Sequence, residues 1–137
     1  MGDTLSPTRR FFQLLTLVYL VCLSWMLLAP DPWIVFGEGG DRLAEQASRT
    51  VADYFQHAGV FVLLAFLADL ALPVTGTDRF VLRAGLLMSY AFLTEVAQIW
   101  IPDRQFQWVD LLANLLGIIT GLLLAHLLGS SRPGSPA

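Results

Sequence analysis

Residues 95–121 read EVAQIWIPDRQFQWVDLLANLLGIITG, two apolar runs separated by a short polar break. The break at residues 102–104, PDR, is too polar to be buried in lipid and too short to form a domain. Glu95 and Gln98 share one face of the first run, because a helix turns about 100° per residue. On the second run the following residues fall within roughly 60° of one another: Asp110, Asn114, Gly117 and Gly121. The stretch predicts a helical hairpin with carboxylates, amides and one arginine near its turn.

The composition of the whole chain is that of a membrane protein. Apolar residues make up 55% of the 137 residues and charged residues 14%, far from the balance of a soluble domain. All eight basic residues are arginines, and no arginine cluster is larger than Arg9-Arg10, so no nucleic-acid partner is expected. The single cysteine, Cys22, lies inside an apolar run, which indicates a packing role.

The first apolar run, residues 11–29, contains no charge. At about 1.5 Å per residue it nearly spans the ~30 Å hydrocarbon core of a bilayer. A signal peptide is the alternative, and Arg9-Arg10 followed by two phenylalanines resembles a twin-arginine export signal. The run exceeds the usual ~7–15 residues of a signal peptide and lacks a small-x-small cleavage site, so we predict a retained first helix.

Three further spans are predicted at residues 57–75, 80–101 and 108–128. The connection at residues 31–56 is polar, and its second half, from about residue 41, has an amphipathic helical pattern. The expected organisation is a cytoplasmic N-terminal segment, a transmembrane domain and a disordered cytoplasmic tail: residues 1–10, 11–128 and 129–137. The predicted fold class is an all-α integral membrane four-helix bundle.

Arginines in the short connections indicate the orientation of the bundle. One side carries Arg9, Arg10, Arg79, Arg83 and Arg132, and the other carries Arg42, Arg49 and Arg104. Three tryptophans lie at the boundary of the second side, as interfacial aromatics do: Trp33, Trp100 and Trp108. Both termini are therefore predicted to be cytoplasmic, in a multi-pass protein of the cell membrane.

The polar residues of the spans converge at one depth. Glu95 lies about 9–10 Å below residue 101, and Asn114 about 9 Å below residue 108, at ~1.5 Å per residue. A carboxylate at that depth costs about 2.5–3.5 kcal/mol unless it faces protein or water. The residues expected together in the outer half of the bundle are Asp53, His57, Glu95, Gln98, Arg104, Asp110 and Asn114. Gly117 and Gly121 would let another helix approach below them.

A second charged pair is expected near the inner ends of its spans. Asp69 and Arg83 are predicted to pair with each other or to extend their charges toward the interface.

Two blocks of this sequence resemble the VanZ-like family of small bacterial membrane proteins, named for a member linked to teicoplanin resistance. The first block is Asp53, His57 and Phe61, with Phe61 where the family more often has tyrosine. The second is the polar and glycine pattern of residues 95–121. The resemblance covers about residues 10–128, and it implies a four-helix domain in the bacterial inner membrane without implying a particular reaction.

These observations support a site for an anionic envelope molecule, such as a lipid-linked cell-wall intermediate or a glycopeptide. Arg104 would hold the anion, because its planar fork pairs two oxygens at once. His57 would exchange a proton, with Asp53 or Asp110 setting its tautomer, and Glu95 would act as general acid or base. Gln98 and Asn114 would complete the binding site. Whether the molecule is held or transformed is left open, as is the oligomeric state; the other expected partners are membrane lipids.

Two alternatives compete with this hypothesis. In the first, the protein is a structural or assembly factor, and its polar cluster serves only to lock the packing of its helices. A divalent metal at Asp53, His57, Glu95 and Asp110 is a further option. Because Arg104 would repel a cation there and no tight ligand spacing occurs, the prediction is that the protein holds no metal and no cofactor.

Overall fold

The computed structural model describes residues 6–30, 50–72, 77–102 and 104–130, without the side chains of residues 50–53, 77–79 and 129–130. Regular structure in these ranges is entirely helical. The four helices are α1 (Pro7–Leu28), α3 (Thr50–Ala71), α4 (Thr77–Gln98) and α5 (Trp108–Ser130). Each contains an apolar stretch of at least 18 residues, which is long enough to cross a membrane. The predicted all-α fold with four membrane-spanning helices is therefore confirmed.

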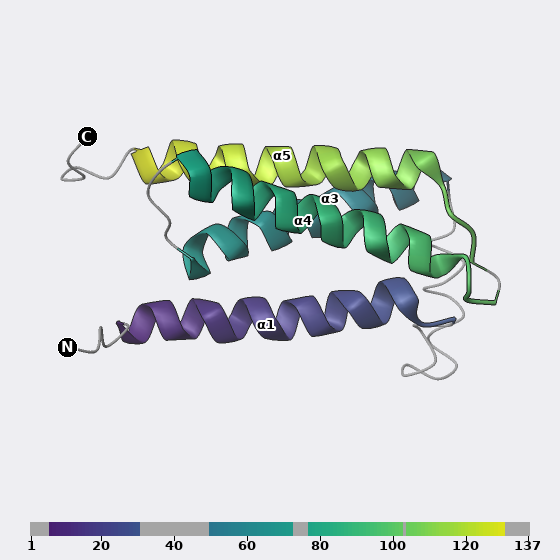
Figure 1. Ribbon diagram of the computed structural model, residues 1–137, viewed down its shortest axis with the longest axis horizontal. Helices are drawn as coiled ribbons and strands as arrows, with labels where there is room; N and C mark the ends of the chain where they lie inside the picture. The colour runs from purple at the N-terminus through teal and green to yellow at the C-terminus, as the bar shows by residue number, and fades with distance from the viewer. Residues whose placement is uncertain (1–5, 31–49, 73–76, 103, 131–137) are drawn as a thin grey trace.

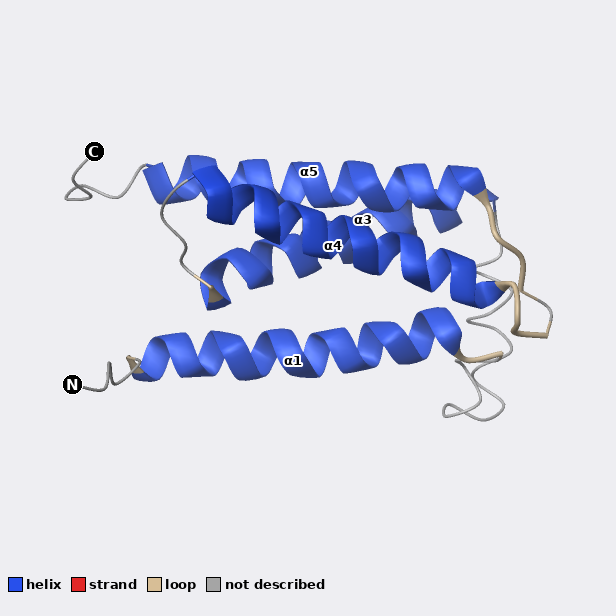
Figure 2. Ribbon diagram, viewed as in Figure 1, coloured by secondary structure: helices blue, strands red, loops and turns tan. Residues whose placement is uncertain are grey.

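The four helices lie alongside one another and alternate in direction, as Figure 1 and Figure 2 show. The beginning of α1 and the end of α5 consequently lie at the same end of the bundle, which we call the terminal end. The opposite end, which we call the distal end, holds the last turn of α1 and residues 99–102 and 104–107. The cytoplasmic location of the terminal end stays a prediction.

Helix α1 begins four residues before the predicted first span. Ser6 is its N-cap: the Ser6 carbonyl accepts hydrogen bonds from the amides of Arg9 (3.0 Å) and Arg10 (3.1 Å). Pro7 follows at a position where a missing N–H costs nothing. The Ser-Pro pair is a recognised helix start, so residues 7–10 are helical.

Helices α4 and α5 also end at different residues from those predicted. Helix α4 ends at Gln98. The next three amides bond to carbonyls three residues earlier in the chain instead of four, at 3.0–3.2 Å. Pro102 accounts for this change, because proline disfavours helical geometry in the residue before it. Helix α5 continues to Ser130, two residues past the predicted limit. Residues 131–137, the rest of the predicted tail, lie outside the described residues. Residues 41–49 of the predicted amphipathic segment lie outside them as well.

Helices α3 and α5 form the most extensive contact of the bundle. Gly117 and Gly121 make this contact possible. A Cβ atom at Gly117 would overlap the backbone carbonyl of Ala58, and one at Gly121 would lie 2.8 Å from the Cβ of Ala65. The predicted close approach at these glycines is confirmed, and the partner is α3.

The core of the bundle is apolar at its centre and polar toward the distal end. The largest fully buried side chains are Phe61, Leu64, Ile118, Glu95 and Asn114. Two of these five are polar, and both come from the stretch that decides the fold. Burying them completely is favourable only if hydrogen bonds compensate the lost solvation, so their partners define the candidate site.

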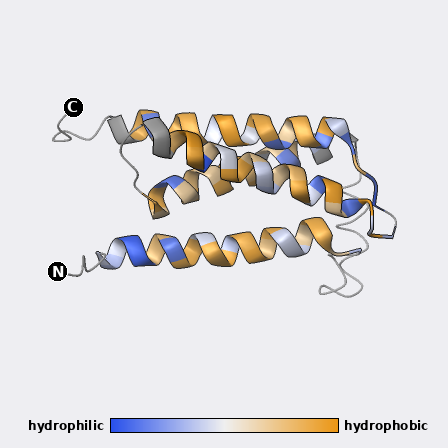
Figure 3. Cartoon of the chain, viewed as in Figure 1, coloured by the Kyte–Doolittle hydropathy of each residue, from blue (hydrophilic) through white to orange (hydrophobic). Residues whose placement is uncertain are grey.

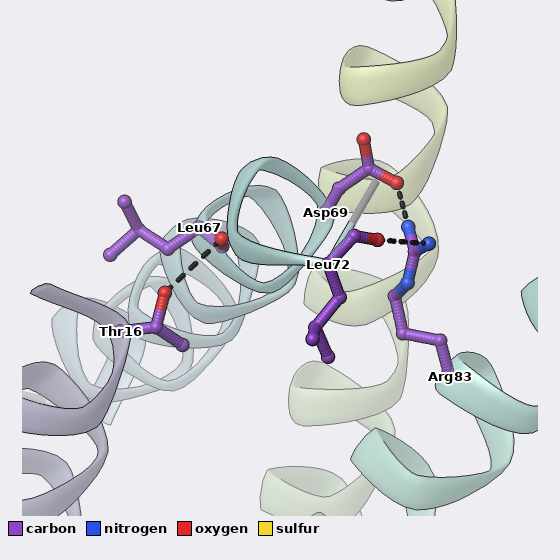
Figure 4. Close-up of polar contacts among 5 residues, drawn as sticks. All are labelled: Thr16, Leu67, Asp69, Leu72 and Arg83. Carbon is purple, nitrogen blue, oxygen red and sulfur yellow. Dashed lines mark hydrogen bonds and ion pairs between the residues drawn. The ribbon is translucent and has the colours of Figure 1, made fainter. Parts of the chain in front are cut away.

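Helix α1 packs against the bundle through buried leucines, Leu23 and Leu27, and through polar side chains. Three of them donate hydrogen bonds to backbone carbonyls of α3: Gln13 to Ala71 (3.4 Å), Thr16 to Leu67 (3.2 Å) and Tyr19 to Val60 (2.9 Å). Figure 4 shows the Thr16 bond. The outer face of α1 is exposed and apolar, with Leu14 64% and Val21 62% exposed. The orange segments of Figure 3 show that hydrophobic residues predominate along the helices. In a bilayer that face contacts lipid.

We expect Thr16→Val to loosen α1 from α3, because valine keeps the shape of threonine and removes the hydroxyl. That hydroxyl shares its proton between the carbonyl of Phe12 on its own helix (2.7 Å) and the carbonyl of Leu67 on α3 (3.2 Å). Interhelical hydrogen bonds in membranes contribute about 0.6–1.7 kcal/mol, and the free energy of unfolding in mixed micelles should fall by that amount. Thr120→Val is the matched control, because the Thr120 hydroxyl bonds only to Leu116 of its own helix, at 2.8 Å. Equal losses in both variants would contradict this account of how α1 is held.

Candidate functional site

A chain of three hydrogen-bonded side chains crosses the bundle in its distal half. The amide nitrogen Nδ2 of Asn114 on α5 donates to Oε1 of Glu95 on α4 at 3.1 Å. The amide oxygen Oδ1 of Asn114 lies 3.2 Å from Nδ1 of His57 on α3. Glu95 and Asn114 are completely buried, whereas His57 is only partly buried. The chain therefore connects a buried carboxylate to an imidazole nearer the surface of the bundle.

Glu95 has further polar neighbours at the same end. His57 and Asp110 interact with it electrostatically, and the backbone amide of Gln107 lies near its carboxylate. Its second oxygen, Oε2, is buried and accepts no well-formed hydrogen bond from the described residues. Asp110 is 4% exposed and lies in the first turn of α5, where the positive end of the helix dipole favours a carboxylate.

Gln98 and Arg104 point to a different partner, the last turn of α1. Nε2 of Gln98 donates to the carbonyl of Leu27 at 3.1 Å, in a buried bond. Nη2 of Arg104 donates to the carbonyls of Met26 and Ala29, each at 3.4 Å. Carbonyls at the end of a helix lack intrahelical partners and attract cations. These two residues therefore tie α1 to the α4–α5 connection.

Six of the seven residues predicted to converge form two groups at the distal end. Glu95, Asn114 and His57 form the hydrogen-bonded chain, with Asp110 close to Glu95, and Gln98 and Arg104 hold the end of α1. The side chain of Asp53 lies outside the described residues. Among the side chains that the structure describes, no three His, Cys, Asp or Glu residues are grouped so as to hold a metal ion.

Asp69 and Arg83 form an ion pair between α3 and α4, so the prediction that they pair is confirmed. Arg83 is 6% exposed, and its Nη2 also donates to the carbonyl of Leu72, just past the end of α3, at 2.8 Å. Figure 4 shows both contacts of the guanidinium. The pair is separated from Glu95 by more than three helical turns of α4 and belongs to the terminal end.

The contributions of α1 were not predicted from the sequence. Besides the carbonyls that receive Gln98 and Arg104, Ser24 of α1 shares a hydrogen bond of 2.8 Å with the hydroxyl of Tyr90 on α4. The ring of Tyr90 also packs against Phe61, with 6.0 Å between centroids. The sequence did contain a signal for these contacts, because Thr16, Tyr19 and Ser24 lie on one side of a largely apolar helix. Polar residues of a membrane helix face protein.

The geometry can be set beside known proteins. A sequence model of the VanZ/LLP1 family matches residues 14–129 of the 137, from the second turn of α1 almost to the end of α5. This chain belongs to the VanZ/LLP1 family. The resemblance found in the sequence is thereby confirmed, and together with the four apolar helices it makes this VanZ/LLP1 chain a multi-pass membrane protein. No match was found among curated proteins or among solved structures.

Proposed function

We propose that this VanZ/LLP1 protein binds an anionic molecule of the bacterial cell envelope at its distal end, and that the distal end faces the outer leaflet. The observation that carries the proposal is the placement of a partly exposed guanidinium, Arg104, at the same end of the bundle as the chain from His57 to Glu95. Such a ligand would be a lipid-linked phosphate of cell-wall synthesis or a peptide carboxylate, and its capture would serve envelope homeostasis or antibiotic resistance.

The bonds of Arg104 support its role as the anion-binding group. Its partners among the described residues are two neutral carbonyls at 3.4 Å, long for a hydrogen bond. A phosphate or carboxylate accepts two parallel, charge-assisted bonds from a guanidinium, and these are about twice as strong as bonds to neutral groups. An arriving anion would therefore compete effectively for this side chain.

His57 supports proton exchange with the bound molecule. It is partly buried, and its Nδ1 is engaged by Asn114. In this proposal His57 gives a proton to the ligand or takes one from it. Glu95 carries the negative charge next to the His57–Asn114 pair, and Asp110 changes the electrostatic potential around Glu95. If the ligand is transformed, these three residues carry the reaction; if it is only held, they set the protonation state at which it binds.

A structural role is the second candidate, and the contacts of Gln98 favour it. Its buried bond to Leu27 and the bond between Asn114 and Glu95 each join two helices. Buried hydrogen bonds between helices can fix one packing arrangement without any chemistry. In that case the polar cluster would lock the bundle of an assembly factor.

Binding of a polyprenyl phosphate to the protein in nanodiscs tests the proposal. We expect Arg104→Gln to weaken binding about ten- to a hundredfold, because hydrogen bonds to charged groups contribute about 1.5–3 kcal/mol. Arg10→Gln is the control, since Arg10 is exposed at the terminal end, and the corresponding uncharged polyprenol should not compete. Equal binding by wild type and Arg104→Gln would overturn the proposal.

The same preparations separate the two candidates. A binding site predicts that Glu95→Gln and Asp110→Asn accumulate as folded protein and lose affinity or its pH dependence. A purely structural cluster predicts loss of detergent-resistant folded protein in both variants, with normal affinity in whatever remains folded.

A further inference from the structure

The orientation of one side-chain amide couples the buried carboxylate to the imidazole. An ionised carboxylate only accepts hydrogen bonds, so the NH₂ group of Asn114 must be the part that faces Glu95 at 3.1 Å. The opposite side of the amide, the oxygen Oδ1, then faces Nδ1 of His57 at 3.2 Å. An amide oxygen also only accepts, and Nδ1 must therefore carry the proton of that bond. Neutral His57 is left with its lone pair on Nε2.

We infer that Asn114 is a positioning residue that translates the protonation state of Glu95 into the tautomer of His57. With Glu95 ionised, His57 carries its proton on Nδ1, and Nε2 is a proton acceptor. With Glu95 protonated, its hydroxyl donates to Oδ1 of a rotated Asn114 amide, whose NH₂ group donates to a bare Nδ1. His57 then holds its proton on Nε2 and is a donor there.

The proton count of this change is one. Glu95 gains a proton, the amide rotates without gaining or losing one, and neutral His57 keeps a single proton that moves from Nδ1 to Nε2 by exchange with solvent. The buried carboxyl would therefore decide whether the distal end takes a proton from a ligand or gives one to it. This deepens the proposed function, because it assigns the proton chemistry of His57 and rests on that proposal for its biological use.

The titratable groups near Glu95 come from two neighbouring helices. Its titratable neighbours are His57 from α3 and Asp110 from α5. Asp53 lies one turn before His57 on α3, and its side chain is outside the described residues. From α1 the described groups at this end are backbone carbonyls, which Gln98 and Arg104 contact. Asn114 forms a hydrogen bond with each group, with Glu95 at 3.1 Å and with His57 at 3.2 Å.

Nitrogen NMR of the histidine rings tests the inference without any ligand. The chain has two histidines, His57 and His126, so ¹⁵N-histidine labelling gives two ring systems, and a His126→Gln sample assigns them. At about pH 8.5, where histidine imidazoles are ordinarily neutral, we expect His57 in bilayers to show a protonated Nδ1 and an unprotonated Nε2. That is the opposite of the tautomer that dominates in free histidine. The ¹³C shift of the Glu95 carboxyl group in the same sample reports whether that group is ionised. A His57 ring with its proton on Nε2 while Glu95 is ionised overturns the inference.

Two variants test the coupling, and a third controls for packing. Asn114→Leu removes the amide, and Glu95→Gln supplies a neutral group that both donates and accepts, so in each we expect the Nδ1-protonated form to lose its dominance. Thr94→Val is the control, because Thr94 is buried beside Glu95 and the described bonds of its hydroxyl go to carbonyls of α4. In this variant the His57 tautomer should match that of the wild type. An unchanged ring in both test variants overturns the inference. Polyprenyl phosphate binding is scored separately, so either proposal is able to fail alone.

Discussion

Replacing Gly117 and Gly121 together by alanine is expected to force α3 and α5 apart and to cause the largest loss of stability of any exchange considered for this bundle. At both positions the new methyl group would meet backbone atoms of α3, the carbonyls of Ala58 and Val62, which have no rotamer to move away by. Overpacking of this kind costs about 1–3 kcal/mol per site. The free energy of unfolding in mixed micelles, with folded yield from membranes, measures the effect.

The chain offers matched controls for that experiment. Gly59 and Gly85 also lie within helices, but a Cβ atom at either would have no neighbour within 4 Å. Alanine is favoured over glycine in a helix by roughly 0.5–1 kcal/mol, so Gly59→Ala and Gly85→Ala should be neutral or stabilising. Comparable losses at all four glycines would show that helix propensity or lipid contact, rather than the α3–α5 contact, determines the result.

The hairpin and its glycine face could be predicted from the sequence because both depend on local geometry. A run of residues without charge has to span the bilayer as a helix, since backbone groups find no other partners in lipid. Helical periodicity then places Asn114, Gly117 and Gly121 on one face. The high energy of an isolated carboxylate in lipid places that face and Glu95 inside the bundle. The observed contacts of these residues follow from the same physics.

Periodicity does not say which helix a polar face will meet. Arg104 was predicted beside the carboxylates from its position at the turn of the hairpin, yet its described bonds go to the end of α1. A prediction based on side chains alone leaves out these backbone carbonyls, although every helix end has carbonyls without intrahelical partners. The same reason applies to Gln98 and Leu27. Helix ends should therefore be counted among the polar groups that a membrane bundle has to satisfy.

The depth of Asn114 also has a consequence for how the bundle is built. The glycines that bring α5 against α3 lie one and two turns after Asn114 on the same face. Close backbone approach at Gly117 therefore fixes the distance between α3 and α5 at the level where Asn114 reaches His57. The packing motif and the polar chain are parts of one arrangement, and a variant that spreads the helices should also lengthen the bond at 3.2 Å.

Replacing Arg83 by methionine should be the second most damaging change, because it removes the cation of Asp69 and the donor to the Leu72 carbonyl at once. Breaking one side of a buried ion pair costs about 3–5 kcal/mol. Asp69 is 33% exposed, so water or headgroups screen part of its charge, and we expect a loss near the lower limit of that range. The free energy of unfolding in mixed micelles measures it.

The double variant Asp69→Leu with Arg83→Met decides whether the loss comes from the pair. Replacing both partners of a buried ion pair by apolar residues is often neutral or stabilising, and at this site leucine and methionine would also suit the apolar surroundings of α3 and α4. We therefore expect the double variant to regain most of the stability that Arg83→Met loses. Additive losses would mean instead that the bond from Arg83 to Leu72, which closes the exposed end of α3, stabilises the terminal end of the bundle more than the ion pair does.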